Sequence, residues 1–188
     1  MVDDFGLLTA RSAVGLALAS HGAQKAFGWF EGPGPQGAAQ FMESLGFVPG
    51  ERYALAASYA EIAAGTLMTL GLLGALGPAL LLSTQSVAAT TVHAKNGFYA
   101  TKGGVELNTL YIAATLALTI AGPGKYSLDE LLGLQILHTP LAKWLTLAGG
   151  LGGGIFMLTR RLPRKPLGEG APSNNGAPGA PQEVAASS

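Results

Sequence analysis

The residues best suited to chemistry in this 188-residue chain are polar and ionisable side chains that interrupt or border long apolar runs. Ionisable groups at membrane depth are costly and usually face a partner or a cavity. The densest stretch is a polar and basic tract, residues 92–108, between two hydrophobic segments. We therefore predict a polar pocket at one end of a helical bundle. Its candidate residues are His21, Gln24, Lys25, Glu61, His93, Asn96, Lys102, Glu106 and Asn108.

Glu61 is the most informative candidate because it lies well inside a hydrophobic segment. An unpaired, ionised carboxylate at that depth is too costly to persist. One interpretation is a pocket in which Glu61 and a histidine transfer protons while Lys25 or Lys102 binds an anion or a quinone carbonyl oxygen. The other is an ion pair of Glu61 with Lys25 or His21 that only fixes helix register. The residue types alone leave both interpretations open.

Other kinds of site find less support in the sequence. His21 and His93 could hold haem or copper between helices, but no third ligand is evident, so we expect no metal site. His138 lies outside the hydrophobic segments, and we expect it to be solvated. The glycines between positions 149 and 154 favour close helix packing over phosphate binding, because no Lys-Ser or Lys-Thr pair follows them.

The composition is that of a membrane protein. The chain is 48% hydrophobic and only 12% charged, with a mean hydropathy of +0.35, whereas soluble domains carry about 25% charged residues. The net charge is zero and no basic patch alternates with aromatic residues, which argues against nucleic acid as a partner. The chain has no cysteine, so disulfides, thiolate catalysis and cysteine-held iron–sulfur clusters are excluded. Electron transfer would require a bound cofactor or a partner protein.

The hydrophobic segments predict an all-α fold: an integral membrane bundle of four core transmembrane helices, a fifth C-terminal span and a disordered tail. The acidic start of the chain is unlike a secretory signal, so we expect the first segment to be retained. Arg11, near one end of that segment, is expected to snorkel toward the membrane surface. The predicted core spans are residues 7–27, 53–73, 79–92 and 107–121, with a short amphipathic helix at 37–47 and a hairpin at 74–78. The predicted domains are residues 1–130 (four-helix membrane domain), 131–162 (connecting loop and fifth span, 141–158) and 163–188 (tail).

The orientation depends on the fifth span. With five spans, eight of the eleven Lys and Arg residues lie on the side of His21, His93 and the C-terminus. The positive-inside rule then places that side in the cytoplasm. With four spans, seven basic residues lie on the side of both termini, and the histidine end faces outward.

Several short motifs occur in a specific order: RSAVGL at 11–16, HGAQKAFG at 21–28, LGFVP at 45–49, EIAAG at 61–65, NGF at 96–98 and GPGKYSLD at 122–129. Together, over about residues 7–130, the sequence resembles the DoxX family of small bacterial membrane proteins. The resemblance implies a four-helix bundle in the bacterial inner membrane. It also implies a link to thiosulfate:quinone oxidoreductase subunits or to complexes that handle oxidative stress.

Two functions follow from the resemblance and the residues. The first is a membrane subunit or anchor of a redox complex, with a protein partner and quinone as the candidate cofactor, rather than a stand-alone enzyme. The second is a non-catalytic scaffold or docking protein whose polar cluster is structural. A small-solute carrier is disfavoured because no internal repeat or paired broken helices are evident.

Overall fold

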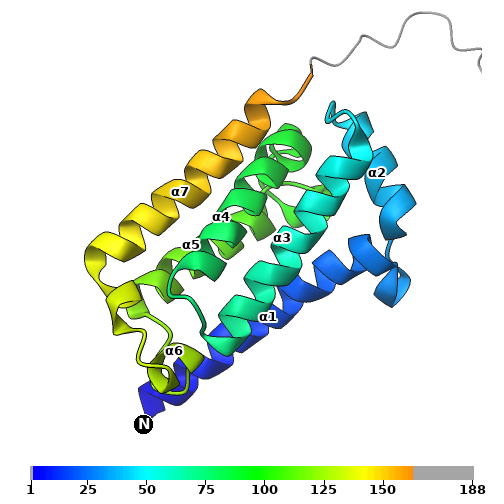
Figure 1. Cartoon of the computed structure of the whole chain (residues 1–188). Coiled ribbons are helices and arrows are strands. Elements are labelled where there is room, and N and C mark those ends of the chain that lie inside the picture. The colour runs from blue at the N-terminus through cyan, green and yellow to red at the C-terminus, as the bar shows by residue number, and fades with distance from the viewer. Residues whose placement is uncertain (1, 163–188) are drawn as a thin grey trace, which may run out of the picture.

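The computed structural model describes residues 2–162, and this part of the chain is helical without any strand (Figure 1). The predicted all-α class is confirmed. The predicted tail, residues 163–188, lies outside the described residues. The main helices are α1 (Val2–Phe27), α3 (Gly50–Leu70), α4 (Leu76–Ala88), α5 (Glu106–Ala121) and α7 (Pro140–Thr159). Two shorter helices are α2 (Gly34–Ser44) and α6 (Leu128–Leu131).

The centre of the bundle is the packing of α1 against α3, which is the most extensive helix contact within residues 2–162. Leu18, Ala64, Met68 and Leu81 form the buried cluster where these helices meet α4. The close approach depends on glycine. A Cβ atom at Gly65 would lie only 2.3 Å from the carbonyl oxygen of Gly15.

Replacing Gly65 with alanine should therefore destabilise the protein by about 1–3 kcal/mol, because the added methyl group pushes two backbones apart. A matched control is Gly149→Ala in α7, where an added Cβ meets nothing within 4 Å. That change should be neutral or stabilise by up to about 1 kcal/mol, since alanine is the better helix former. Thermal unfolding of both purified variants in mild detergent measures the difference. Equal melting temperatures for the two variants would contradict the close packing.

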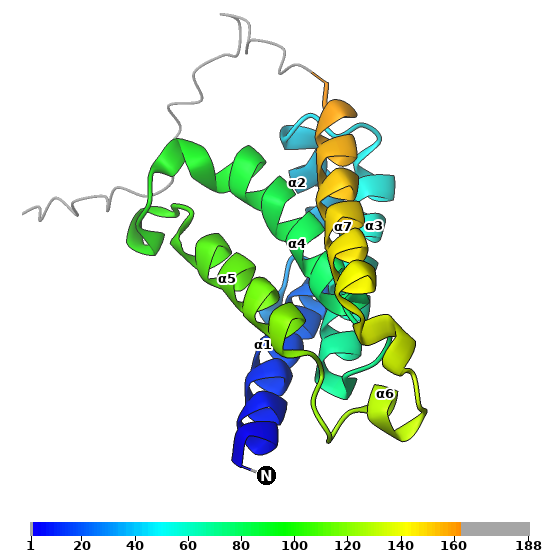
Figure 2. The ribbon, with the colours of Figure 1, turned by 90° about the vertical axis from the view of Figure 1, so that its left-hand side faces the viewer.

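The other helices are arranged by short connections. A tight turn after α3 places α4 beside it, as expected for a hairpin. Helix α7 packs along α4 and runs in the same direction (Figures 1 and 2). The segment that leads into α7 lies close to Gly74 through Leu137, and just beyond the end of α7 the backbone N–H of Leu162 donates to the carbonyl of Gly46 at 2.9 Å. The end of α7 is thus fastened to the loop that follows α2.

The outer surface is apolar and several inner positions are polar. Large apolar side chains are exposed along the main helices, among them Leu16, Leu55, Leu110, Ile120, Leu145 and Ile155. Buried polar residues include Arg11, Glu61, Gln85, Asn108 and Thr115. Among the described residues, only α7 is both long and apolar enough to cross a membrane by itself, while α5 is apolar but shorter. The four-span bundle therefore remains a prediction.

Two expectations about side chains at the N-terminal end of the bundle are wrong. Arg11 does not snorkel: it is 3% exposed and its guanidinium donates to the carbonyls of Met68, Thr69 and Tyr126. The first two carbonyls belong to the last turn of α3, whose negative dipole end attracts a cation. His138 is only partly solvated: its side chain is 22% exposed, and its Nε2 lies 2.9 Å from Oδ2 of the fully buried Asp129.

Candidate functional site

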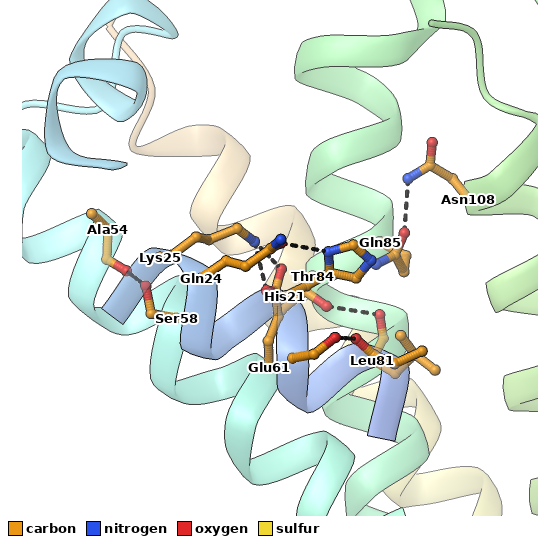
Figure 3. Close-up of polar contacts among 12 residues, drawn as sticks. His21, Gln24, Lys25, Ala54, Ser58, Glu61, Leu81, Thr84, Gln85 and Asn108 are labelled. Atoms are coloured by element: carbon orange, nitrogen blue, oxygen red, sulfur yellow. Dashed lines mark hydrogen bonds and ion pairs between the residues drawn. The ribbon is translucent and has the colours of Figure 1, made fainter. Parts of the chain in front are cut away.

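The structure brings Lys25 of α1 and Glu61 of α3 together as an ion pair (Figure 3). Lys25 Nζ lies 2.5 Å from each carboxylate oxygen of Glu61. The Glu61 side chain is 9% exposed and that of Lys25 is 30% exposed, so the carboxylate is buried and the ammonium group is not fully so. Lys25, His21 and His93 are the partners that the sequence suggests for Glu61, and the structure shows Lys25 in this place.

A cavity of about 650 Å³ lies beside this ion pair, between α2, α3 and α4. Such a volume is typical of small-molecule sites, which span about 300–1,000 Å³. Lys25 and Glu61 are the only members of the nine-residue candidate set that line it. Most of the remaining lining is apolar, with Tyr53, Ser83, Thr84 and Thr91 as further polar residues.

Helix α2 forms one wall of the cavity and packs closely against α3. Ala38 and Ala39 are buried against Ala54 of α3, and these small residues allow a close approach. Phe41 and Met42 lie farther along α2 and line the cavity. The sequence predicted a short amphipathic helix here, but not that it would enclose a space against α3. The amphipathic pattern was the one signal that could have suggested a wall.

The cavity lining shows that the end of α1 and the end of α4 lie at the same end of the bundle. Lys25 near the end of α1 and Thr91 and Val92 beyond the end of α4 all line it. The chain continues from α4 as a π-turn, Ala89–His93, which buries Thr91. The first and third predicted spans therefore share one end of the bundle, as the hairpin between α3 and α4 indicated.

His21 and Gln24 lie close to the ion pair in sequence but form a separate contact. His21 Nδ1 is 3.2 Å from Gln24 Oε1 one turn along α1, and His21 is exposed. The Gln24 amide donates to the Phe30 carbonyl at 3.4 Å. Figure 3 shows this contact beside, and not within, the Lys25–Glu61 pair.

The polar tract at residues 92–108 is mainly a loop that binds to itself. His93 Nδ1 lies 2.7 Å from the Gly103 carbonyl, to which the Asn96 amide also donates. Glu106 Oε2 accepts from the backbone N–H of Ala100 at 2.8 Å. Lys102 is exposed. The structure does not bring these four candidate residues to the cavity.

Asn108 has a different partner, which the sequence analysis did not include. Its side-chain amide donates to Gln85 Oε1 at 2.8 Å, and both residues are buried (Figure 3). This contact joins α4 to α5 away from the ion pair. Gln85 was visible as a polar residue inside an apolar run, but its spacing from other polar residues indicated no partner.

Comparison with known proteins shows a similarity to one protein family. A family model described as DoxX matches residues 6–94. Residues 6–94 thus form a DoxX region, which spans just under half of the chain. No curated protein and no solved structure gives a match. All the lining residues of the cavity except Met157 fall within the matched DoxX region. The predicted extension of the resemblance to residue 130 stays a prediction.

The cavity has one polar end, formed by Lys25 and Glu61, and a long apolar wall. The Lys25 ammonium group has three N–H donors, and the Glu61 carboxylate accepts hydrogen bonds or a proton. An apolar molecule with a polar head could place its head at the ion pair and its body against Phe41, Met42 and Val87. The geometry thus suits binding of an amphipathic ligand.

Proposed function

We propose that this DoxX protein is a multi-pass protein of the bacterial inner membrane that binds a quinone in the cavity, as the membrane subunit of a redox complex. The observation that carries the proposal is the cavity of about 650 Å³ with the Lys25–Glu61 pair in its otherwise mostly apolar wall. A quinone has carbonyl oxygens at a compact head and an apolar tail. These two parts match the two parts of the cavity.

In this proposal Lys25 donates a hydrogen bond to a quinone carbonyl oxygen, and Glu61 exchanges protons at the same end. Reduction of a quinone to a quinol requires two electrons and two protons. The electrons come from a partner oxidoreductase, since the chain has no cysteine to hold an iron–sulfur cluster or a redox-active thiol. In this proposal the protons enter from the surface beside the partly exposed Lys25 side chain and pass through Glu61 to the quinone oxygens.

The placement in the membrane is supported by the distribution of polarity. Exposed Leu and Ile side chains cover the main helices, while Glu61, Gln85 and Asn108 are buried between them. The end of α7 lies beside Leu45, whose carbonyl accepts from Arg161 Nε. Arg160 and Arg161 therefore gather at the same end as Lys25, which is the arrangement of the five-span topology.

This topology predicts that the residues after α7 are cytoplasmic. A reporter fused behind Leu162 should be active if it is a cytoplasm-dependent enzyme and inactive if it requires the periplasm. A second fusion in the loop at Gly124 should give the opposite pattern. The reverse result at both positions would place the cavity end outside and would contradict the five-span orientation.

The test of ligand binding is purification in mild detergent followed by solvent extraction and identification of co-purified quinone. Ala57 lines the cavity, so Ala57→Phe should fill it and abolish co-purification. Ala63 lies on an exposed face of the same helix, and Ala63→Phe should retain the wild-type amount. Absence of quinone from wild type, or equal amounts in both variants, would refute the quinone site.

The second candidate function is the non-catalytic scaffold. The observation in its favour is that both carboxylate oxygens of Glu61 accept from Lys25. An ion pair between α1 and α3 can fix their register alone. Retention of full biological function by a variant that lacks both charges would favour this candidate.

A further inference from the structure

A second polar site lies at the opposite end of the bundle from Lys25, around Arg11. The guanidinium terminal nitrogens of Arg11 donate to carbonyls of α3 and of Tyr126. Its Nε is buried and has no hydrogen-bond partner. The hydroxyl of Thr119, a residue that is 3% exposed, is likewise buried without a partner. Buried polar atoms normally have partners, so each of these atoms calls for an explanation.

Both residues line the same small cavity, of about 30 Å³. A cavity of this volume, measured with a water-sized probe, holds one or two particles of that size, because about 10–15 Å³ is needed for each water. His138 and Lys143 also line it. The space is too small for a phosphate ester or a quinone.

The lining of this cavity contains the cationic side chains of Arg11 and Lys143 and no acidic side chain. Within residues 2–162, no carboxylate is within ion-pair distance of Arg11, although a buried charge normally requires a partner. Asp129, on α6 behind His138, is already bonded by His138 and by the N–H groups of Leu73 and Gly74. Lys143 Nζ makes one bond, to the Ile120 carbonyl at 3.1 Å, and has two further donors.

The free groups are donors, and this favours an anion over water. Arg11 Nε and Lys143 Nζ can only donate, and the Thr119 hydroxyl can donate as well. A water molecule would need acceptors for its own two protons, whereas a halide accepts from every side. We propose that this cavity is a binding site for a single monovalent anion of halide size, held by Arg11, Thr119 and Lys143.

The site is independent of the quinone proposal. Arg11 lies within the region matched by the DoxX model, whereas Thr119 and Lys143 lie beyond it. The anion would join α1, α5 and α7 at this end of the bundle. Its expected effect is therefore on stability and not on the ligand at the Lys25–Glu61 pair.

The experiment measures the melting temperature of the full chain in mild detergent, in bromide or gluconate at one ionic strength. Bromide at about a hundredfold excess over its Kd should raise the melting temperature by roughly 5 °C relative to gluconate. Thr119→Val should reduce this bromide effect strongly, yet should be at least as stable as wild type in gluconate, because it removes an unpaired hydroxyl. Lys143→Gln should weaken the effect.

Thr115→Val is the matched control. Thr115 lies on the same helix and is fully buried, but its hydroxyl already donates to the Tyr111 carbonyl. This variant should keep the full bromide shift. Crystals grown in bromide should show an anomalous peak between Arg11 and Thr119. Equal melting temperatures in both salts, an unchanged shift in Thr119→Val, or a water at the site in saturating bromide would each overturn the proposal.

Discussion

Lys25→Met is expected to destabilise the protein by about 3 kcal/mol, because it leaves the buried Glu61 carboxylate without its partner. The value is at the lower end for a buried pair, since the Lys25 side chain is 30% exposed. The double variant Lys25→Met/Glu61→Leu should recover most of the loss, because two apolar side chains replace two charges. Thermal unfolding of the purified variants in mild detergent measures both effects. Lys102→Met, at an exposed lysine, should change the stability by less than about 0.5 kcal/mol.

The same variants separate the two functions of the ion pair. If the pair binds quinone, the double variant folds but loses co-purified quinone and fails to complement a gene deletion. Glu61→Gln should also fold, since it preserves shape and hydrogen bonding, and should lose proton exchange. A double variant that is both stable and fully complementing would remove the pair from any mechanism and leave the scaffold function. A double variant as unstable as Lys25→Met would contradict the energetic argument.

Asp129→Ala should destabilise the protein by about 3–5 kcal/mol, the second large effect we expect. The Asp129 side chain is fully buried and accepts from the N–H groups of Leu73 and Gly74 at 2.8 and 2.6 Å. It also contacts His138 Nε2 at 2.9 Å. Removing the carboxylate leaves two backbone donors and an imidazole without their acceptor. The turn between α3 and α4 then loses the hydrogen bonds that join it to Asp129. Thermal unfolding in detergent measures the loss.

Glu130→Ala is the control for this prediction, because Glu130 is the adjacent acidic residue and its side chain is exposed. It should change the melting temperature very little. His138→Gln should fall between the two, since it removes one of the three contacts of Asp129. If Asp129→Ala and Glu130→Ala melt at the same temperature, the turn does not depend on the buried carboxylate.

The helices could be predicted closely from the sequence because each apolar run has about the length of one helix, and three of the runs end at a glycine, Gly28, Gly74 or Gly122. The predicted spans at residues 53–73 and 141–158 correspond to α3 (Gly50–Leu70) and α7 (Pro140–Thr159). The surroundings of Arg11 and His138 could not be predicted in this way. The partners of Arg11, such as Tyr126, come from segments far along the chain, and the partner of His138, Asp129, lies across a loop. Hydrophobic spacing carries no information about either contact.

The candidate site was predictable only where one helix pairs with its neighbour. Lys25 and Glu61 lie on α1 and α3, and a buried carboxylate implies a cation beside it. The cavity itself depends on the packing of α2 against α3, which follows from the small size of Ala38 and Ala39 at one particular crossing. The polar tract at residues 92–108 suggested a ligand site, but its polar groups form hydrogen bonds within the loop. His93 and Asn96 share the Gly103 carbonyl and need no ligand.

The hydrogen bonds between the residues after α7 and the loop after α2 have a consequence for biosynthesis. Met157 completes the cavity wall, while Arg161 and Leu162 bind the carbonyls of Leu45 and Gly46. These are among the last described residues to leave the ribosome, whereas every other lining residue is made by position 92. The cavity of the nascent chain therefore lacks this part of its wall while about seventy further residues are translated. Translation proceeds at roughly 5–20 residues per second. The wall of the cavity is in this way completed only after Met157 has been translated.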